Sequence, residues 1–268
     1  MTTTSSRRPG HDIDPRIRHR RQEVRRHEGR RRLRRLAVVG GAAGFVVAGA
    51  LLSSSPLLDV DRVEVEGVLH TDAEEVRRAA AIDIGEAMLT VRGSRATRAI
   101  EKLPWVATAT VVRSWPATVI VNVAERSAVA VADLGAHRQV ILGADGRQLA
   151  VVSRGDQRAE GLPVLQGLQF EPAPGQAVDP SDMGAVELAE RLGAQFDAAE
   201  VRVVVTDGAL EAALSRKPRG QLVARFGTPD RLEAKVSALA SVVQQAGAGV
   251  AVVDVSAPDA PALTRAGS

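Results

Sequence analysis

The 268-residue chain contains no cysteine. A disulfide scaffold, a thiol nucleophile and a cysteine-ligated zinc or iron–sulfur site are therefore excluded. Aromatic residues make up only 2% of the chain, so alanine, valine and leucine must fill its core. Hydrophobic residues nevertheless reach 45%, which is enough for folded domains.

Lysine is also scarce, since only three of the 35 basic residues are lysines. The charge is uneven: residues 1–35 hold 13 arginines and four acidic residues, a net charge of +9, and the remainder carries −6. A segment so rich in like charges and poor in apolar residues is predicted to be disordered. Its arginines can attract anionic lipid, which we expect, or nucleic acid, which is the alternative.

The sequence lacks the common catalytic motifs. It contains no H-E-x-x-H, G-x-S-x-G, S-x-x-K or phosphate-binding loop. The acidic residues near the end of the apolar run alternate with valines, which is typical of the solvated face of a strand rather than of a metal loop; they are Asp59, Asp61, Glu64 and Glu66. We predict a protein that is not an enzyme and that holds no cofactor or metal.

Residues 36–52 form one apolar run of 17 residues, and no charge follows until Asp59. At a rise of ~1.5 Å per residue, this run and the uncharged stretch 36–58 span roughly 26 and 35 Å. A bilayer core of ~30 Å lies between the two lengths. We predict a transmembrane helix over 36–58 with the arginine-rich tail in the cytoplasm, by the positive-inside rule. A buried soluble helix and a cleaved signal peptide are the alternatives.

Gly40 and Gly44 within this run form a small-xxx-small pair. Such pairs let two membrane helices approach closely. The simpler explanation is that the whole chain is rich in alanine and glycine, so that small residues also fill this run. Packing of Gly40 and Gly44 against another helix is the alternative.

Residues 59–126 predict the order strand, helix, helix, strand, strand. Residues 63–66 alternate apolar and polar, as in a half-buried strand that ends at Gly67. Thr71 and Glu74 form a capping box for a helix that runs to Ala80, and Ser94 is expected to cap a second helix that ends before Pro104. Strands are predicted over 106–112 and 119–123.

This order, with its residues, resembles a POTRA domain of the FtsQ/DivIB family of cell division proteins. The resemblance covers about 70 residues. It includes an L-P-W-V stretch at 103–106, an R-x-W-P turn at 113–116 and a strand ending in Glu125 and Arg126. The residues that carry the family's structural motif are Gly67, Pro104, Trp105, Arg113, Trp115 and Pro116. We expect both tryptophans to be packing anchors rather than ligand platforms.

The following residues, 127–256, predict a mixed domain rich in strands. Strands are expected over 129–132, 139–142, 148–152, 201–205, 210–214 and 221–226. Helices are expected over 181–192, and again after Thr228 as a cap with Pro229 in the first turn. A last apolar strand follows, and residues 257–268 should be flexible.

In the family that the chain resembles, the last strand of this domain binds membrane partners by adding a strand at the sheet edge. The resemblance thus implies a partner-binding edge at Val250, Ala251, Val252, Val253, Asp254 and Val255. The chemistry would be pairing of free backbone N–H and C=O groups with a partner strand. An ordinary interior strand is the alternative.

The sequence therefore predicts an α+β protein in five parts: a basic cytoplasmic tail (1–35), a transmembrane helix (36–58), a POTRA-like domain (59–126), a β domain (127–256) and a flexible tail (257–268). The resemblance implies a single-pass scaffold of the cell membrane at the division septum. Its implied partners are FtsB-type and FtsL-type proteins and, through them, the septal peptidoglycan synthases. An extracytoplasmic envelope enzyme and a cytoplasmic nucleic-acid binder are the rival hypotheses.

Overall fold

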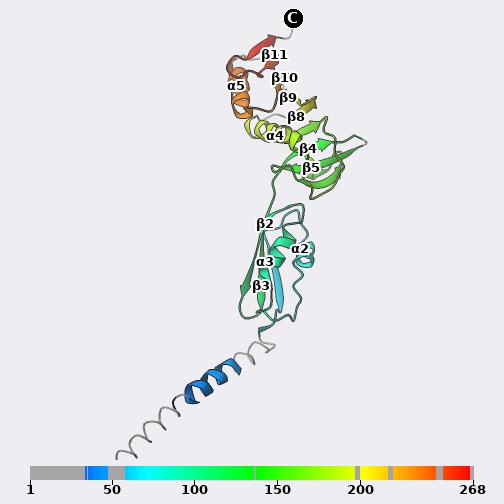
Figure 1. Ribbon diagram of the computed structural model, residues 1–268. Coiled ribbons are helices and arrows are strands. Elements are labelled where there is room, and N and C mark those ends of the chain that lie inside the picture. Colours follow the sequence, from blue (N-terminus) through cyan, green and yellow to red (C-terminus); the bar gives the residue numbers. More distant parts are fainter. Residues whose placement is uncertain are drawn as a thin grey trace, which may run out of the picture.

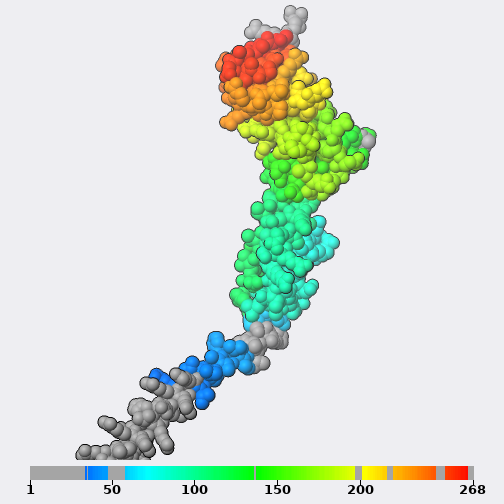
Figure 2. Space-filling view, viewed as in Figure 1, coloured from blue at the N-terminus to red at the C-terminus, as the bar shows by residue number. Residues whose placement is uncertain are grey.

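The computed structural model describes residues 34, 36–47, 58–135, 137–196, 200–216, 220–245 and 250–265. Two domains follow one another along an elongated body (Figure 1). The space-filling view narrows to a waist between them (Figure 2). The chain order of the predicted domains is therefore also their order in space.

Residues 36–47 are helical, and their large apolar side chains are exposed, as in Phe45 at 82%. Within the described ranges, no helix combines the length and the hydrophobicity needed to cross a bilayer. The rest of the predicted span, and the predicted tail apart from Arg34, lie outside the described residues. An added Cβ at Gly40 or Gly44 would meet nothing within 4 Å, so their proposed packing against another helix stays a prediction.

The first domain has the predicted order of elements. These are β1 (Arg62–Glu66), α2 (Ala73–Ala80), α3 (Gly93–Ile100), β2 (Val106–Ser114) and β3 (Thr118–Glu125). β3 lies in the middle of the sheet, parallel to β1 and antiparallel to β2. Because side chains alternate along a strand, Val119, Val121 and Val123 all face the helices, where they are buried with Val76 and Ile100.

The predicted caps of both helices in this domain are wrong by one or two residues. Asp72, not Thr71, caps α2, since its carboxylate accepts a hydrogen bond from the Glu74 N–H at 3.1 Å. The Thr71 N–H instead donates to the Glu125 carboxylate at 2.8 Å. Ser94 lies inside the first turn of α3, which begins at Gly93 without a side-chain cap. Hydrogen bonding to Glu125, a strand residue distant in sequence, thus takes the place of the predicted capping role of Thr71.

The second domain is built on one nine-stranded sheet with the order β12-β11-β10-β9-β8-β7-β4-β5-β6. The first seven strands in chain order are β4 (Ala128–Asp133), β5 (Arg138–Gly143), β6 (Gln148–Ser153), β7 (Val164–Gln166), β8 (Glu200–Thr206), β9 (Ala209–Arg216) and β10 (Gly220–Gly227). Apart from the last strand, which ends at Asp254 and not at Val255, every strand predicted in this domain lies within one of the observed strands. β7 was not among the predicted strands, and it joins the two halves of the sheet by parallel pairing with β4 and β8.

Helices α4 (Met183–Gln195) and α5 (Leu232–Gln245) cover one face of this sheet. Thr228 does not cap α5, which starts four residues later. The reason is Lys235, only 1% exposed, whose ammonium group donates to the Thr228 carbonyl at 2.8 Å and to the Asp230 carboxylate at 3.1 Å. These bonds hold residues 228–230 in a turn ahead of the helix.

The chain continues into β11 (Val250–Asp254) and then into β12 (Ala262–Arg265). The predicted flexible tail is therefore wrong over Ala262–Arg265, which pairs antiparallel with β11. Their sequence, A-L-T-R, is too short to be recognised as a strand without its partner.

Candidate partner-binding edge and domain junction

The predicted binding strand is not at the edge of the sheet. β11 lies between β10, to which it is parallel, and β12, to which it is antiparallel. The expectation that residues 250–255 leave one side unpaired is thus wrong for this structure, because β12 occupies that side. The outermost strand at this end is β12.

The two faces of β11 have different environments. Val253 and Val255 are fully buried in the core that the helices cover. Ala251, Val252 and Asp254 are half-buried. Pairing of a partner with β11 in place of β12 would therefore put new side chains beside Val252 and Asp254 on one face and beside Val253, which is now opposite Leu263, on the core face.

β12 is held weakly. Its described side chains, Ala262, Leu263 and Thr264, are all exposed, with Leu263 at 47%. Beyond its backbone pairing, the segment is fastened by an ion pair between Arg231 and Asp259 at 3.0 Å. Both of these side chains are more than half exposed, so the pair adds little stability.

The chain turns away from β11 immediately after Asp254. The Ser256 hydroxyl and N–H donate to the Asp254 carboxylate at 2.6 and 2.9 Å. The hydroxyl bond lowers the pKa of Asp254, and the backbone bond adds to this effect. A charged Asp254 therefore fixes the point at which the C-terminal segment folds back onto β11.

A second site is the junction of the two domains, centred on Trp105. This side chain, 8% exposed, packs in a small core with Val131, Ile141 and Leu149 of the second domain. Its other contact is with the His70 ring, which stacks on it at a centroid distance of 4.3 Å and an interplanar angle of 8°. The prediction that Trp105 is a packing anchor is confirmed, and the surface it anchors lies between domains.

Arg126 joins the same two domains through polar contacts. Its guanidinium donates to the Asp145 carboxylate of the β5–β6 turn at 2.8 Å, to the Pro104 carbonyl at 3.0 Å and to the Val106 carbonyl. Burial raises the pKa of Asp145, but the hydrogen bonds from Arg126 and the Arg147 N–H, together with the charges of both arginines, outweigh it, and the pKa is lowered.

Glu125, the preceding residue, holds the loop between β1 and α2. It accepts hydrogen bonds from the backbone N–H groups of His70 at 2.9 Å and Thr71 at 2.8 Å, and lies 3.0 Å from the His70 ring nitrogen Nδ1. Burial alone would raise the pKa of Glu125, but these backbone donors lower it to about 2. The carboxylate therefore stays charged at any physiological pH and positions His70 on Trp105.

The other motif residues have separate positions. Gly67 has φ = +82°, and a Cβ there would lie 2.1 Å from the Val123 carbonyl oxygen, so only glycine lets β1 and β3 approach. Arg113 donates to the Val91 carbonyl and ties the end of β2 to the loop before α3. Trp115, followed by the exposed Pro116, is 51% exposed, so its predicted role as a packing anchor is wrong.

Sequence reasoning missed the junction. It identified the pair Glu125 and Arg126 as the end of a strand and Asp145 as part of a hairpin turn, but gave neither Asp145 nor His70 a role in a contact between domains. The available signal was two adjacent residues of opposite charge at the point where one domain passes into the next. Their partners are 19 and 55 residues away in sequence, which no local pattern reveals.

Neither site, among its described residues, gathers a set of metal-ligating side chains. Over the residues that the structure describes, no group of three or more histidine, aspartate or glutamate side chains could hold a metal ion. What the two sites offer is backbone pairing at the β11–β12 end and a fixed connection between the domains.

Comparison with known proteins gives consistent matches. Residues 58–126 match the family model described as "POTRA domain, FtsQ-type". Over 249 residues the chain is 32% identical to the cell division protein FtsQ of Streptomyces collinus, which covers 88% of this chain and 90% of that relative. It is 31% identical to the FtsQ of Streptomyces griseus, over 78% of this chain and 99% of the relative. It is 30% identical to the FtsQ of Mycolicibacterium smegmatis, over 81% of this chain and 61% of the relative.

Proposed function

The chain belongs to the FtsQ family of cell division proteins, and we propose that it acts in the division machinery as a non-catalytic scaffold anchored in the cell membrane. Its role would be to recruit and regulate the machinery of septal peptidoglycan synthesis through protein contacts. The apolar run at 36–52, preceded by arginines, supports an anchor with the folded domains outside the cytoplasm.

The observation that supports the proposal is the strand arrangement at the β12 end of the nine-stranded sheet. Backbone pairing is the contact that this end can offer, and the partner strand would come from an FtsB-type or FtsL-type protein. We propose that it pairs with β11 in place of β12. Replacement is favoured because β12 buries little of its own surface, whereas β11 is anchored in the core by Val253 and Val255.

The energies make such an exchange feasible. Each backbone hydrogen bond contributes a net ~0.5–1.5 kcal/mol. A partner strand that matches the hydrogen bonds of β12 and also buries apolar side chains against Val252 would therefore displace it. A partner that adds outside β12 is the competing arrangement, and it would leave β11 untouched.

A matched pair of substitutions tests the proposed edge. Val252→Asp places a charge on the half-buried face of β11, and Val151→Asp makes the same change on β6, the strand at the opposite edge of the sheet, where Val151 is 40% exposed. We expect Val252→Asp to weaken binding of an FtsB–FtsL-type complex by about tenfold or more, because the charge would be desolvated by the partner strand. Val151→Asp should leave binding unchanged.

Binding is measured with the full chain in detergent or nanodiscs, and thermal unfolding of both variants checks that they are folded. Undiminished binding by a folded Val252→Asp protein would rule out partner pairing on β11.

A further inference from the structure

The end of the first domain opposite the second domain carries exposed apolar side chains. The β2–β3 turn lies at this end (Figure 1). The exposed fractions are 51% for Trp115, 58% for Leu89 and 75% for Ile84. We call this the Trp115 end. Large apolar side chains exposed together are a feature that marks interaction surfaces.

This end is also where the chain enters the domain. The Met88 N–H donates to the Leu58 carbonyl at 2.9 Å, and the Gly85 N–H donates to the Val60 carbonyl at 2.8 Å. On the other side, the Asp61 N–H donates to the Ala117 carbonyl at 2.8 Å. The loops that hold Ile84, Leu89 and Trp115 are therefore bonded directly to residues 58–61.

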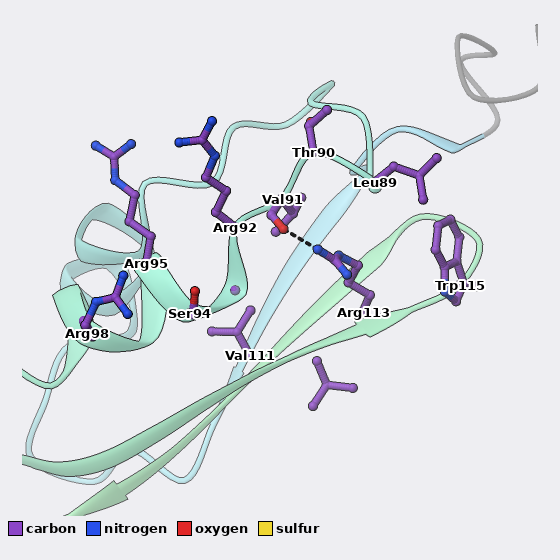
Figure 3. Close-up of a pocket in the computed structure, with 12 residues that line it drawn as sticks. Leu89, Thr90, Val91, Arg92, Ser94, Arg95, Arg98, Val111, Arg113 and Trp115 are labelled. Atoms are coloured by element: carbon purple, nitrogen blue, oxygen red, sulfur yellow. Dashed lines mark hydrogen bonds between the residues drawn. The ribbon is translucent and has the colours of Figure 1, made fainter. Parts of the chain in front are cut away.

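An arginine-lined groove of about 1070 Å³ opens beside these side chains. It lies between the loop before α3 and the end of β2, and four arginines line it: Arg92, Arg95, Arg98 and Arg113 (Figure 3). Leu89 and Trp115 lie toward its β2–β3 turn side (Figure 3). None of the described residues lining the groove is acidic.

Stability does not explain these arginines. Arg92, Arg95 and Arg98 are exposed, and none forms an ion pair with an acidic side chain in the part of the chain that the structure describes. Like charges three residues apart along a helix repel one another. Other arginines of this domain, such as Arg77 with Glu74, are paired. A groove with unpaired cations beside exposed apolar groups suits an amphipathic, anionic surface.

We propose that the Trp115 end lies on the anionic membrane leaflet to which the chain is anchored. Trp115 and Leu89 would enter the headgroup region, and Arg92, Arg95 and Arg98 would bind the phosphodiester headgroups of anionic phospholipids. Tryptophan favours this interfacial depth because its ring is apolar and its N–H is polar. The inference rests on the proposed membrane anchor.

The short connection between the apolar run and the first domain favours the membrane as the surface that the Trp115 end contacts. Only residues 53–57 separate the apolar run from Leu58, and five residues reach at most ~18 Å. The Trp115 end is therefore confined near the bilayer, which raises the effective concentration of headgroups around it.

The acidic residues at the same end predict how the domain is oriented. Asp61 and Asp83 line a different surface, on the β1 and α2 side. That surface also carries arginines, so its charges are mixed, whereas the groove on the α3 side is lined by arginines without an acidic residue. The domain should therefore lean with its α3 side toward the anionic leaflet.

Tryptophan quenching tests the proposal in the full chain. The protein is reconstituted in vesicles of phosphatidylcholine with or without phosphatidylglycerol, with acyl chains brominated near the headgroup. Because the sequence has two tryptophans and Trp105 is buried, quenching should report on Trp115. We expect strong quenching with phosphatidylglycerol, weaker quenching without it, and loss of the quenched component in Trp115→Phe.

The arginines are tested by two charge-matched triple variants. Arg92→Gln/Arg95→Gln/Arg98→Gln should reduce quenching in phosphatidylglycerol vesicles to the level of pure phosphatidylcholine. Arg78→Gln/Arg138→Gln/Arg225→Gln removes three exposed charges outside the groove and should leave quenching unchanged. Circular dichroism confirms that each variant is folded.

The outcomes separate the two proposals. A chain that fails to float with the vesicles would overturn the membrane anchor itself. A chain that floats, but whose Trp115 is not quenched in phosphatidylglycerol vesicles, would overturn the membrane contact of the Trp115 end. Equal quenching by both triple variants would overturn the role of the groove.

Discussion

At the scale of single residues, the fold depends on a few groups that link distant parts of the chain. Glu125 is the clearest example, because one carboxylate satisfies two backbone N–H groups of the β1–α2 loop and positions the ring that stacks on Trp105. Removing its charge should loosen that loop and the domain junction together.

The pKa of Glu125 gives a pH dependence with a defined sign. It is lowered from 4.5 to about 2 in the folded protein. The stabilisation is therefore complete above the unfolded value and is lost as the pH falls from about 4.5 through 2. Glu125→Gln should cost about 2–3 kcal/mol of stability at neutral pH, and this difference from the wild type should vanish toward pH ~2.

Thermal unfolding of both proteins across this pH range measures the effect. Comparing them removes the contribution of other carboxylates with lowered pKa, such as Asp145, which both proteins retain. A constant difference between the two proteins at all pH values would contradict this explanation.

Substitutions at two glycines distinguish the cost of backbone strain from the cost of lost close packing. Gly67 and Gly85 both have positive φ, at +82° and +88°, but only at Gly67 would a Cβ meet a neighbour, the Val123 carbonyl oxygen. Gly85→Ala should destabilise the protein by about 1 kcal/mol through strain alone. Gly67→Ala should cost about 2–4 kcal/mol, because β1 must also move away from β3.

The melting temperatures of the two variants provide this comparison. Equal losses of stability would show that strand contact at Gly67 adds nothing beyond its φ angle.

At the scale of elements, most of the secondary structure could be predicted from the sequence. The period-2 valines of β1 and β3 and the apolar spacing of α4 and α5 are local patterns, and local patterns survive folding. The helix starts at Thr71 and Thr228 were wrong because hydrogen bonds with Glu125 and Lys235 hold these residues outside the caps. Ser94 was wrong because α3 already begins at Gly93.

The candidate site was predicted only in part. Residues 250–255 read correctly as an apolar strand, but their position in the sheet depends on a strand of four residues that has no pattern of its own. Trp105 and Trp115 are indistinguishable by local sequence, since each adjoins a proline, yet one is buried between domains and the other is half exposed. Burial of this kind is set by the second domain, which local sequence does not describe.

At the scale of the whole molecule, the two proposed contacts lie at opposite ends. The β11–β12 end is far from the Trp115 end, with the junction between them (Figure 1). β3 alone, with eight residues, spans roughly 26 Å. If the Trp115 end lies on the membrane, a partner of β11 must extend well beyond the bilayer surface to reach it.

The junction between the two domains keeps these two ends apart. Trp105 and Arg126 join the first domain to the second by apolar packing and by a short ion pair. Under the proposed function, the first domain would act as a spacer of fixed direction, and the second domain would present its sheet end to partners. This arrangement suits a scaffold that selects partners by the length of their extracytoplasmic segments.

The most direct test of partner pairing on β11 is the affinity of an FtsB–FtsL-type complex for the full chain and for the chain ended at Ser256. Removing 257–268 deletes β12 and leaves the core residues Val253 and Val255 in place. Because the partner then no longer has to displace β12, we predict tighter binding, by about tenfold if a net ~1.4 kcal/mol of β12 pairing is lost. Weaker or absent binding by the shortened, folded chain would contradict the proposal and would place the partner on β12 itself.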